Sequence, residues 1–443
     1  MSTRTDRGII VTCVAFLLTA ALVAVASQGL LYAAVAIVLA AYLVVLLTVG
    51  PRTTGIACMM AAFASAPMYR GIENITGGVP PTDVFVIAAI IHLAPTFVGN
   101  RLKVPTIYIL GLMLMSICSL IAVMITGNLF VNAFYAVQWL FFVGALPLVM
   151  AWWRPHYKIV DILCWSYLGG HLLSTMKAVV EGPVYGGRYD GLTHHPNAFG
   201  VAGLTSIAIV LYLVRHHKDV RTRVILAGFV ATSMASIVMS GSRAAVVVLV
   251  VIILLVPIVE RSALAGIGLA ILASLGVISL PLIVSLSGEG SAIGRLAGEG
   301  TATASDNVRD AALSVGFDRF WSSPILGSGF DGVEQFHNVY LEAAVATGVI
   351  GLLAYLLVLY PLARPLFSLH PMRRLTYVVW VFMGVAPTFP GLWDRTMWVP
   401  ASLAALAMLD PALLQTPSDT APVGRRAVRK RPKAPAGAGV SLR

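Results

Sequence analysis

Long apolar runs recur along almost the whole chain and constrain its fold more than any other feature. Each run is about 17 to 25 residues long, enough to cross the roughly 30 Å hydrocarbon core of a bilayer as a helix. A spanning segment must satisfy its own backbone groups, and a helix does so. The sequence therefore predicts an all-α fold, a polytopic transmembrane helical bundle of about 12 to 14 spans. The expected spans lie near residues 8–26, 30–49, 55–68, 84–98, 105–125, 129–151, 159–179, 198–214, 224–240, 244–259, 263–286, 338–362, 375–392 and 397–409.

Composition excludes a soluble core. The chain is 58% hydrophobic and 11% charged, whereas soluble domains are roughly 25% charged. The net charge of +11 does not require a nucleic-acid partner, because six basic residues crowd into residues 425–433. We expect this Pro- and Ala-rich tail to be disordered and held near anionic lipid. The four cysteines lie in apolar runs without zinc-ligand spacing, which predicts packing roles and no metal site.

Charge placement predicts the topology. With a cytoplasmic N-terminus, most of the 30 lysines and arginines fall on the cytoplasmic side, as the positive-inside rule requires. Both termini are therefore expected in the cytoplasm, and residues 181–197 and 287–337 become outer loops. The first run follows Arg4 and Arg7 and lacks a small-x-small cleavage site, so we expect a retained anchor.

Four segments follow from this organisation. We expect N-terminal transmembrane helices over 1–179, a core with its two outer loops over 180–362, C-terminal transmembrane helices over 363–410, and the basic tail over 411–443. Long loops that are not mere connections often carry function. Within the second outer loop, residues 308–321 have the apolar spacing of a helix on a membrane surface. This helix is either a lid over a site or an ordinary surface helix.

Three polar groups stand where a helix is expected to start at the outer surface, at residues 194–197, 241–243 and 337–338. A helix N-terminus carries unsatisfied N–H groups and a partial positive charge, so it attracts anions. Arg188 and Arg243 add a planar fork suited to phosphate. Together these residues predict an outward-facing phosphate site. Asn197, Ser242 and Asn338 are expected to cap their helices.

Simpler interpretations stand beside each residue. An arginine such as Arg243 at an outer helix end can be a snorkelling interface residue. Ser242 before a helix is ordinary capping, and His337 alone fits a hydrogen-bonded surface histidine. Glu342 is harder to explain in this way, because a carboxylate inside a span is costly without a partner.

In this order the motifs resemble the O-antigen ligase and polymerase superfamily of bacterial envelope proteins. The resemblance covers roughly residues 185–360. It rests on R-x-x-G-x-x-x-H-P-N from Arg188 to Asn197, G-S-R from Gly241 to Arg243, S-P-I-L-G-S-G-F from Ser323 to Phe330 after Arg309, and H-N-V-Y-L-E-A-A-V-A-T-G-V-I-G from His337 to Gly351.

The resemblance implies a glycan transferase of the cytoplasmic (inner) membrane. Such proteins move a glycan from an undecaprenyl-diphosphate carrier to an acceptor hydroxyl at the outer face, with no cofactor, nucleotide sugar or metal. Carried onto this chain, Arg188 and Arg243 bind the diphosphate, and His337 is the general base or a phosphate contact. Arg309 is a weaker third cation. The remaining expected substrate-binding residues are His195, Asn197, Ser242, Asn338 and Glu342.

Other functions remain open. The motifs do not separate a ligase from a polymerase, and the acceptor is a glycan, a lipid or a protein. A flippase for lipid-linked sugars is the leading non-enzyme alternative, although no internal repeat supports it. Glycosyltransferases of the shape and division class are a second enzyme alternative, and a structural scaffold a third hypothesis. The oligomeric state is not predicted.

Overall fold

The computed structural model describes residues 30–68, 79–184, 186–264, 266–271, 274, 291–296 and 302–414. These residues are mainly helical and contain no β-strand, so the predicted all-α fold is confirmed. The expected span 8–26, most of the span 263–286 and the tail beyond residue 414 lie outside the described residues.

Six helices of the described part are long and apolar enough to cross a membrane. They coincide with expected spans, since each is an uninterrupted apolar run. They are α6 (Thr106–Ile125), the continuous α7–η1–α8 (Leu129–Trp139, Leu140–Ala145 and Leu146–Trp153), α10 (Pro196–His216), α11 (Val220–Met239), α12 (Arg243–Glu260), and α16 with η3 (Val339–Ala363 and Arg364–Phe367).

Four other expected spans are also helical. α2 (Leu30–Val49) is a 20-residue apolar helix, whereas α3 (Pro51–Ser65) and α5 (Pro81–Phe97) are shorter and α9 (Tyr157–Glu181) is more polar. The last two differ most from expectation: 375–392 contains only α17 (Tyr377–Val385), and 397–409 is α18 (Arg395–Ala401) followed by the 3-10 turn η5 (Ser402–Met408). Pro387 and Pro390 explain the early end of α17, because proline supplies no backbone donor.

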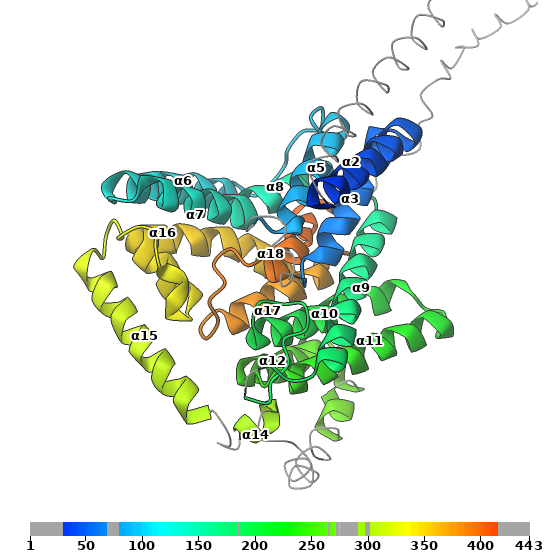
Figure 1. Ribbon diagram of the computed structural model, residues 1–443. Helices are drawn as coiled ribbons and strands as arrows, with labels where there is room; N and C mark the ends of the chain where they lie inside the picture. Colours follow the sequence, from blue (N-terminus) through cyan, green and yellow to red (C-terminus); the bar gives the residue numbers. More distant parts are fainter. Residues whose placement is uncertain are drawn as a thin grey trace, which may run out of the picture.

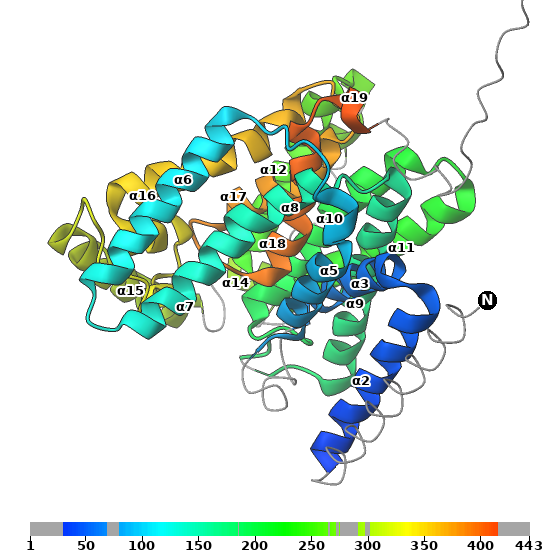
Figure 2. The same ribbon diagram turned by 90° about the horizontal axis from the view of Figure 1, so that it is seen from above.

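α10 lies at the centre of the bundle (Figure 1). Nearly all of its side chains are buried, and it packs against α9, α11, α12, α17 and α18. Around this centre, helices distant in sequence lie side by side: α6 runs along α16, and α3 packs on both α5 and α9 (Figure 2). The first expected segment thus packs directly on the core that carries the motifs.

α16 is broken at Gly348, whose φ of 72° is left-handed. A Cβ there would lie 1.9 Å from the Ile325 carbonyl oxygen, so only glycine fits. The S-P-I-L-G-S-G motif fills this break: the amides of Ser328 and Gly329 donate to the Val345 and Ala346 carbonyls at 2.7 and 3.1 Å. The motif therefore satisfies backbone groups that the helix alone leaves open.

α15 (Ala302–Ser322) lies along one side of the bundle (Figure 1). It runs from near the short α14 (Ala292–Leu296) toward α16. It contacts α16 and the 3-10 turn η2 (Val333–Phe336). Near its C-terminal end, Arg319 donates from Nε to the Ser328 hydroxyl and from Nη1 to the Asp331 carbonyl, both at 2.7 Å. The expected helix over 308–321 is therefore present and tied to the loop that follows it. The remaining elements are η4 (Arg373–Thr376) and α19 (Pro411–Leu414).

Candidate functional site

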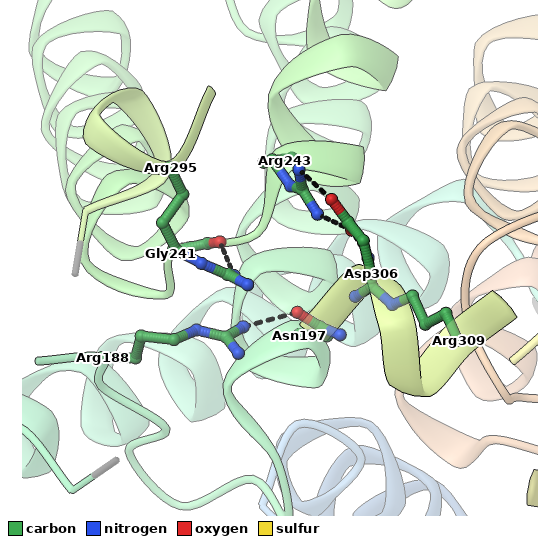
Figure 3. Close-up of polar contacts among 7 residues, drawn as sticks. All are labelled: Arg188, Asn197, Gly241, Arg243, Arg295, Asp306 and Arg309. Carbon is green, nitrogen blue, oxygen red and sulfur yellow. Dashed lines mark hydrogen bonds and ion pairs between the residues drawn. The ribbon is translucent and has the colours of Figure 1, made fainter. Parts of the chain in front are cut away.

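Four arginines from separate parts of the chain meet at the start of α10 and α12 (Figure 3). Arg188 comes from the loop before α10, Arg243 begins α12, Arg295 lies in α14 and Arg309 in α15. Because guanidinium groups keep their charge at any physiological pH, this end of the bundle carries a concentrated positive potential.

Arg188 is held rigidly. It is 4% exposed, and its Nε donates to the Ser240 carbonyl at 2.8 Å while Nη2 donates to Asn197 Oδ1 at 2.5 Å. The loop that carries it is itself fixed, since the Tyr189 amide donates to the Met239 carbonyl at 3.0 Å. The guanidinium thus links the end of α11 to the start of α10.

Arg188, Arg309 and His337 line one cavity of about 230 Å³, which we call the arginine cavity. Arg295 joins them: it is 1% exposed and donates from Nη1 to the Gly241 carbonyl at 2.7 Å. α15 forms one wall, so the helix over 302–322 has the position of a lid. The full lining is Arg188, His195, Asn197, Arg295, Ala304, Ser305, Val308, Arg309 and His337.

Both histidines of the arginine cavity are held neutral at physiological pH. Burial, followed by the charge of Arg188, lowers the pKa of His195 to about 3. Burial and then Arg309 lower the pKa of His337. Among the described residues the buried Nδ1 of His337 has no hydrogen-bond partner. A neutral imidazole with an unpaired nitrogen is able to accept a proton.

The backbone at His337 is also unusual. Its φ of 53° lies in the left-handed region, which a residue with a β-carbon adopts at a cost of about 1–2 kcal/mol. Asn338 directly after it caps α16, and its Oδ1 accepts from the amides of Tyr340 and Leu341 at 3.1 Å. The capped helix start fixes the conformation that places His337 in the cavity.

Two of the three expected caps are present. Asn338 caps α16, and Ser242 caps α12 by accepting from the Ala245 amide at 3.4 Å. The expectation for Asn197 is wrong: α10 begins at Pro196, and the cap is His195, whose Nδ1 accepts from the Asn197 amide at 3.0 Å. Proline favours the first position of a helix, so the capping position falls one residue before it. The Asn197 side chain instead accepts from Arg188.

Arg243 does not line the arginine cavity. Its two Nη atoms bind the Asp306 carboxylate as a fork, with Nη1 to Oδ2 at 3.0 Å. The pair borders a second hollow of about 370 Å³, the apolar groove, whose walls include Val247, Val248 and Gly384. Arg309 lines both the apolar groove and the arginine cavity. The structure therefore brings Arg188 and His337 together in the arginine cavity and places Arg243 in the neighbouring apolar groove.

Glu342 also lies outside the arginine cavity. It is fully buried in the first turn of α16 and lines a third hollow of about 380 Å³, which we call the aromatic cavity. Tyr135 and Trp393 belong to the same lining, as does His194. The neighbouring His195 lines the arginine cavity, so the two cavities flank the His194–His195 segment.

Arg295 and Asp306 were not predicted as site residues from the sequence, although the structure places both beside the predicted arginines. Both stand in the second expected outer loop, and the sequence signal for them is their charge in a largely apolar chain. In the described residues no group of three or more His, Cys, Asp and Glu side chains is arranged to hold a metal ion.

The model of the O-antigen ligase family matches residues 227–356. The predicted resemblance is confirmed over this stretch, which holds Arg243, Arg295, Arg309, His337 and Glu342. Arg188 and the start of α10 precede it and complete the arginine cavity. No curated protein matches the chain.

Proposed function

From this family match and the arginine cavity we propose that the protein is a membrane glycan transferase. It moves a glycan from an undecaprenyl-diphosphate carrier to an acceptor hydroxyl at the outer face of the cytoplasmic membrane. The observation that carries the proposal is the cavity in which Arg188, Arg295 and Arg309 stand beside the neutral His337. A diphosphate needs fixed positive charge, and an acceptor hydroxyl needs a base, and this cavity supplies both.

The reaction breaks the bond between the sugar's anomeric carbon and the phosphate oxygen and forms one to the acceptor oxygen. Negative charge grows on the departing diphosphate, and Arg188 and Arg309 stabilise it because their guanidiniums are already in place. His337 takes the acceptor proton as the new bond forms. The products are the glycosylated acceptor, undecaprenyl diphosphate and the proton.

The apolar groove suits the lipid part of the donor. Val247 and Val248 belong to α12, an apolar helix long enough to span a membrane, and Arg309 joins the groove to the arginine cavity. A carrier whose isoprenoid chain lies along α12 therefore has its diphosphate next to Arg309. Arg243, paired with Asp306 at the boundary, is the guanidinium placed to contact an entering diphosphate.

Deletion of the gene tests the reaction. Envelope glycans are sized and lipid-linked intermediates are measured in the deleted strain, with and without the wild-type protein or the His337→Ala variant. Carrier-linked glycan should accumulate at the outer face in the deleted and variant strains. An unmodified acceptor identifies a ligase, and chains of a single repeat identify a polymerase. Accumulation at the cytoplasmic face would contradict the proposal and favour a flippase.

The sidedness has its own test in intact cells. A cysteine at Gly186, in the loop beside Arg188, should react with an impermeant thiol reagent, and one at Lys218, between α10 and α11, should be protected. Labelling at Lys218 with protection at Gly186 would invert the topology.

A further inference from the structure

The aromatic cavity is separate from the arginine cavity, and the proposed reaction assigns it no role. It lies where α3 ends, where α5, α16 and α18 begin, and beside the loop between α17 and α18. His194 and His195, just before α10, line the aromatic cavity and the arginine cavity respectively, so the two cavities lie at the same end of α10.

One wall holds a stacked pair of aromatic rings. The rings of Tyr135 and Trp393 stack with centroids 4.9 Å apart and planes 19° apart, and the Trp393 ring also neighbours that of Phe330. Tyr135 and Trp393 are both partly exposed although they line a cavity. Ligand sites typically combine such rings with a few fixed polar groups. A pyranose ring has this pattern, with an apolar face of C–H groups and a rim of hydroxyls.

Two carboxylates belong to the lining of the aromatic cavity. Glu342 is 0% exposed yet lines the cavity, and Asp394 lines it beside the start of α18. Arg395 contributes little free positive charge, because its Nε and Nη2 bind the Asp83 carboxylate at 2.9 and 2.6 Å. Carboxylates accept hydrogen bonds from hydroxyls and repel phosphate. The chemistry therefore favours a neutral, hydroxyl-rich ligand over the diphosphate.

The position of the cavity relates it to the reaction. His337 lines the arginine cavity, and Glu342, five residues later at the start of α16, lines the aromatic cavity. Likewise, His195 lines the arginine cavity and His194 lines the aromatic cavity. A sugar in the aromatic cavity thus lies across a shared wall from the proposed base.

We propose that the aromatic cavity binds the carbohydrate of the acceptor, with a sugar ring packed against the stacked pair of Trp393 and Tyr135 and with hydroxyls donating to Glu342. This inference rests on the proposed transfer for its role, and it names the acceptor as a glycan. Trp393 and Glu342 are then acceptor-binding residues, whereas Arg188 serves the donor.

Direct binding separates this inference from the transfer reaction. The purified full-length protein is titrated by calorimetry with two probes: undecaprenyl diphosphate, and water-soluble oligosaccharides released from envelope glycans of the deleted strain. Wild-type protein should bind both. Trp393→Ala and Glu342→Gln should weaken oligosaccharide binding at least tenfold and leave binding of undecaprenyl diphosphate within twofold. Trp393→Phe, which keeps an aromatic face, should recover most of the affinity.

Trp165→Ala is the matched control, because Trp165 contacts His217 and Phe229 at the other end of the bundle. It should bind both probes like the wild type. Failure of wild-type protein to bind any oligosaccharide, or binding that survives both Trp393→Ala and Glu342→Gln, would overturn the inference. If oligosaccharide binding follows the prediction but the deleted strain shows no transfer defect, the aromatic cavity stands and the proposed function fails.

Discussion

Replacing Arg188 by lysine keeps the positive charge in the arginine cavity but removes the fork. The guanidinium makes two hydrogen bonds, to the Ser240 carbonyl and to Asn197, in a side chain that is 4% exposed. One ammonium group reaches at most one of these acceptors, so one charged hydrogen bond is lost. Such a bond contributes about 1.5–3 kcal/mol, and this is the expected loss of folding stability. A lost contact of the same size to the diphosphate weakens its binding about 10- to 150-fold.

Arg374→Lys provides the matched control. Arg374 donates to the Leu211 carbonyl at 3.0 Å and pairs with Glu260 at 2.6 Å, near the opposite end of α10. Both lysine variants should therefore lose stability, measured as the fraction folded after heating in detergent. Only Arg188→Lys should lose affinity for undecaprenyl diphosphate, measured by calorimetry at a temperature where both variants are folded.

Two results would refute this reasoning. If Arg188→Lys binds undecaprenyl diphosphate as tightly as wild type, Arg188 holds the loop and α10 together and does not bind donor. If Arg374→Lys loses the same affinity, the defect reflects general destabilisation.

His337→Asn should fold, since asparagine tolerates the left-handed φ of 53°, while turnover falls about 10²- to 10⁴-fold and donor binding persists; equal turnover would exclude His337 as the base. Burial and then Arg309 lower the pKa of His337 below its usual value of about 6.5, so the base is neutral at pH 7. The wild-type transfer rate should therefore fall with acid only below about pH 6.5. A fall centred above that pH would contradict the assignment. Asp306→Asn removes the ion pair with Arg243 and should tighten donor binding. Because Asp306 is well exposed, the expected gain in binding free energy is about 0.2–1 kcal/mol, or about 1.4- to 5-fold in affinity, measured by titration with undecaprenyl diphosphate. Transfer by purified protein should survive excess chelator because the arginines supply the positive charge, and loss restored by Mg²⁺ or Mn²⁺ would refute that role.

The sequence was most informative about elements that depend on nearby residues. Apolar runs mark α6, α10 and α16 because spanning a bilayer depends on length and polarity alone. Arg188, Arg243 and His337 were expected in one site because each stands near a helix start expected at the same face. Arg188 and His337 line the arginine cavity, whereas Arg243 lines the neighbouring apolar groove.

Contacts between distant residues could not be predicted in this way. The pairing of Arg243 with Asp306 depends on where α15 folds back, which no local pattern specifies. The aromatic cavity was missed because Trp393 fell in the short connection expected between the spans 375–392 and 397–409, whereas α17 ends at Val385 and leaves a longer loop. At α10, the position of Pro196 decided between two neighbouring capping residues.

The break at Gly348 has a mechanical consequence. Backbone bonds from Ser328 and Gly329 stitch the loop after α15 to the outer part of α16, and the Val349 amide adds a third to the Pro324 carbonyl at 2.8 Å. These bonds couple α15 to the first turns of α16. α16 also packs along α6. A tilt of α15 would therefore also move the segment that holds His337 and Glu342, and under the proposed function donor entry and acceptor alignment would be coupled.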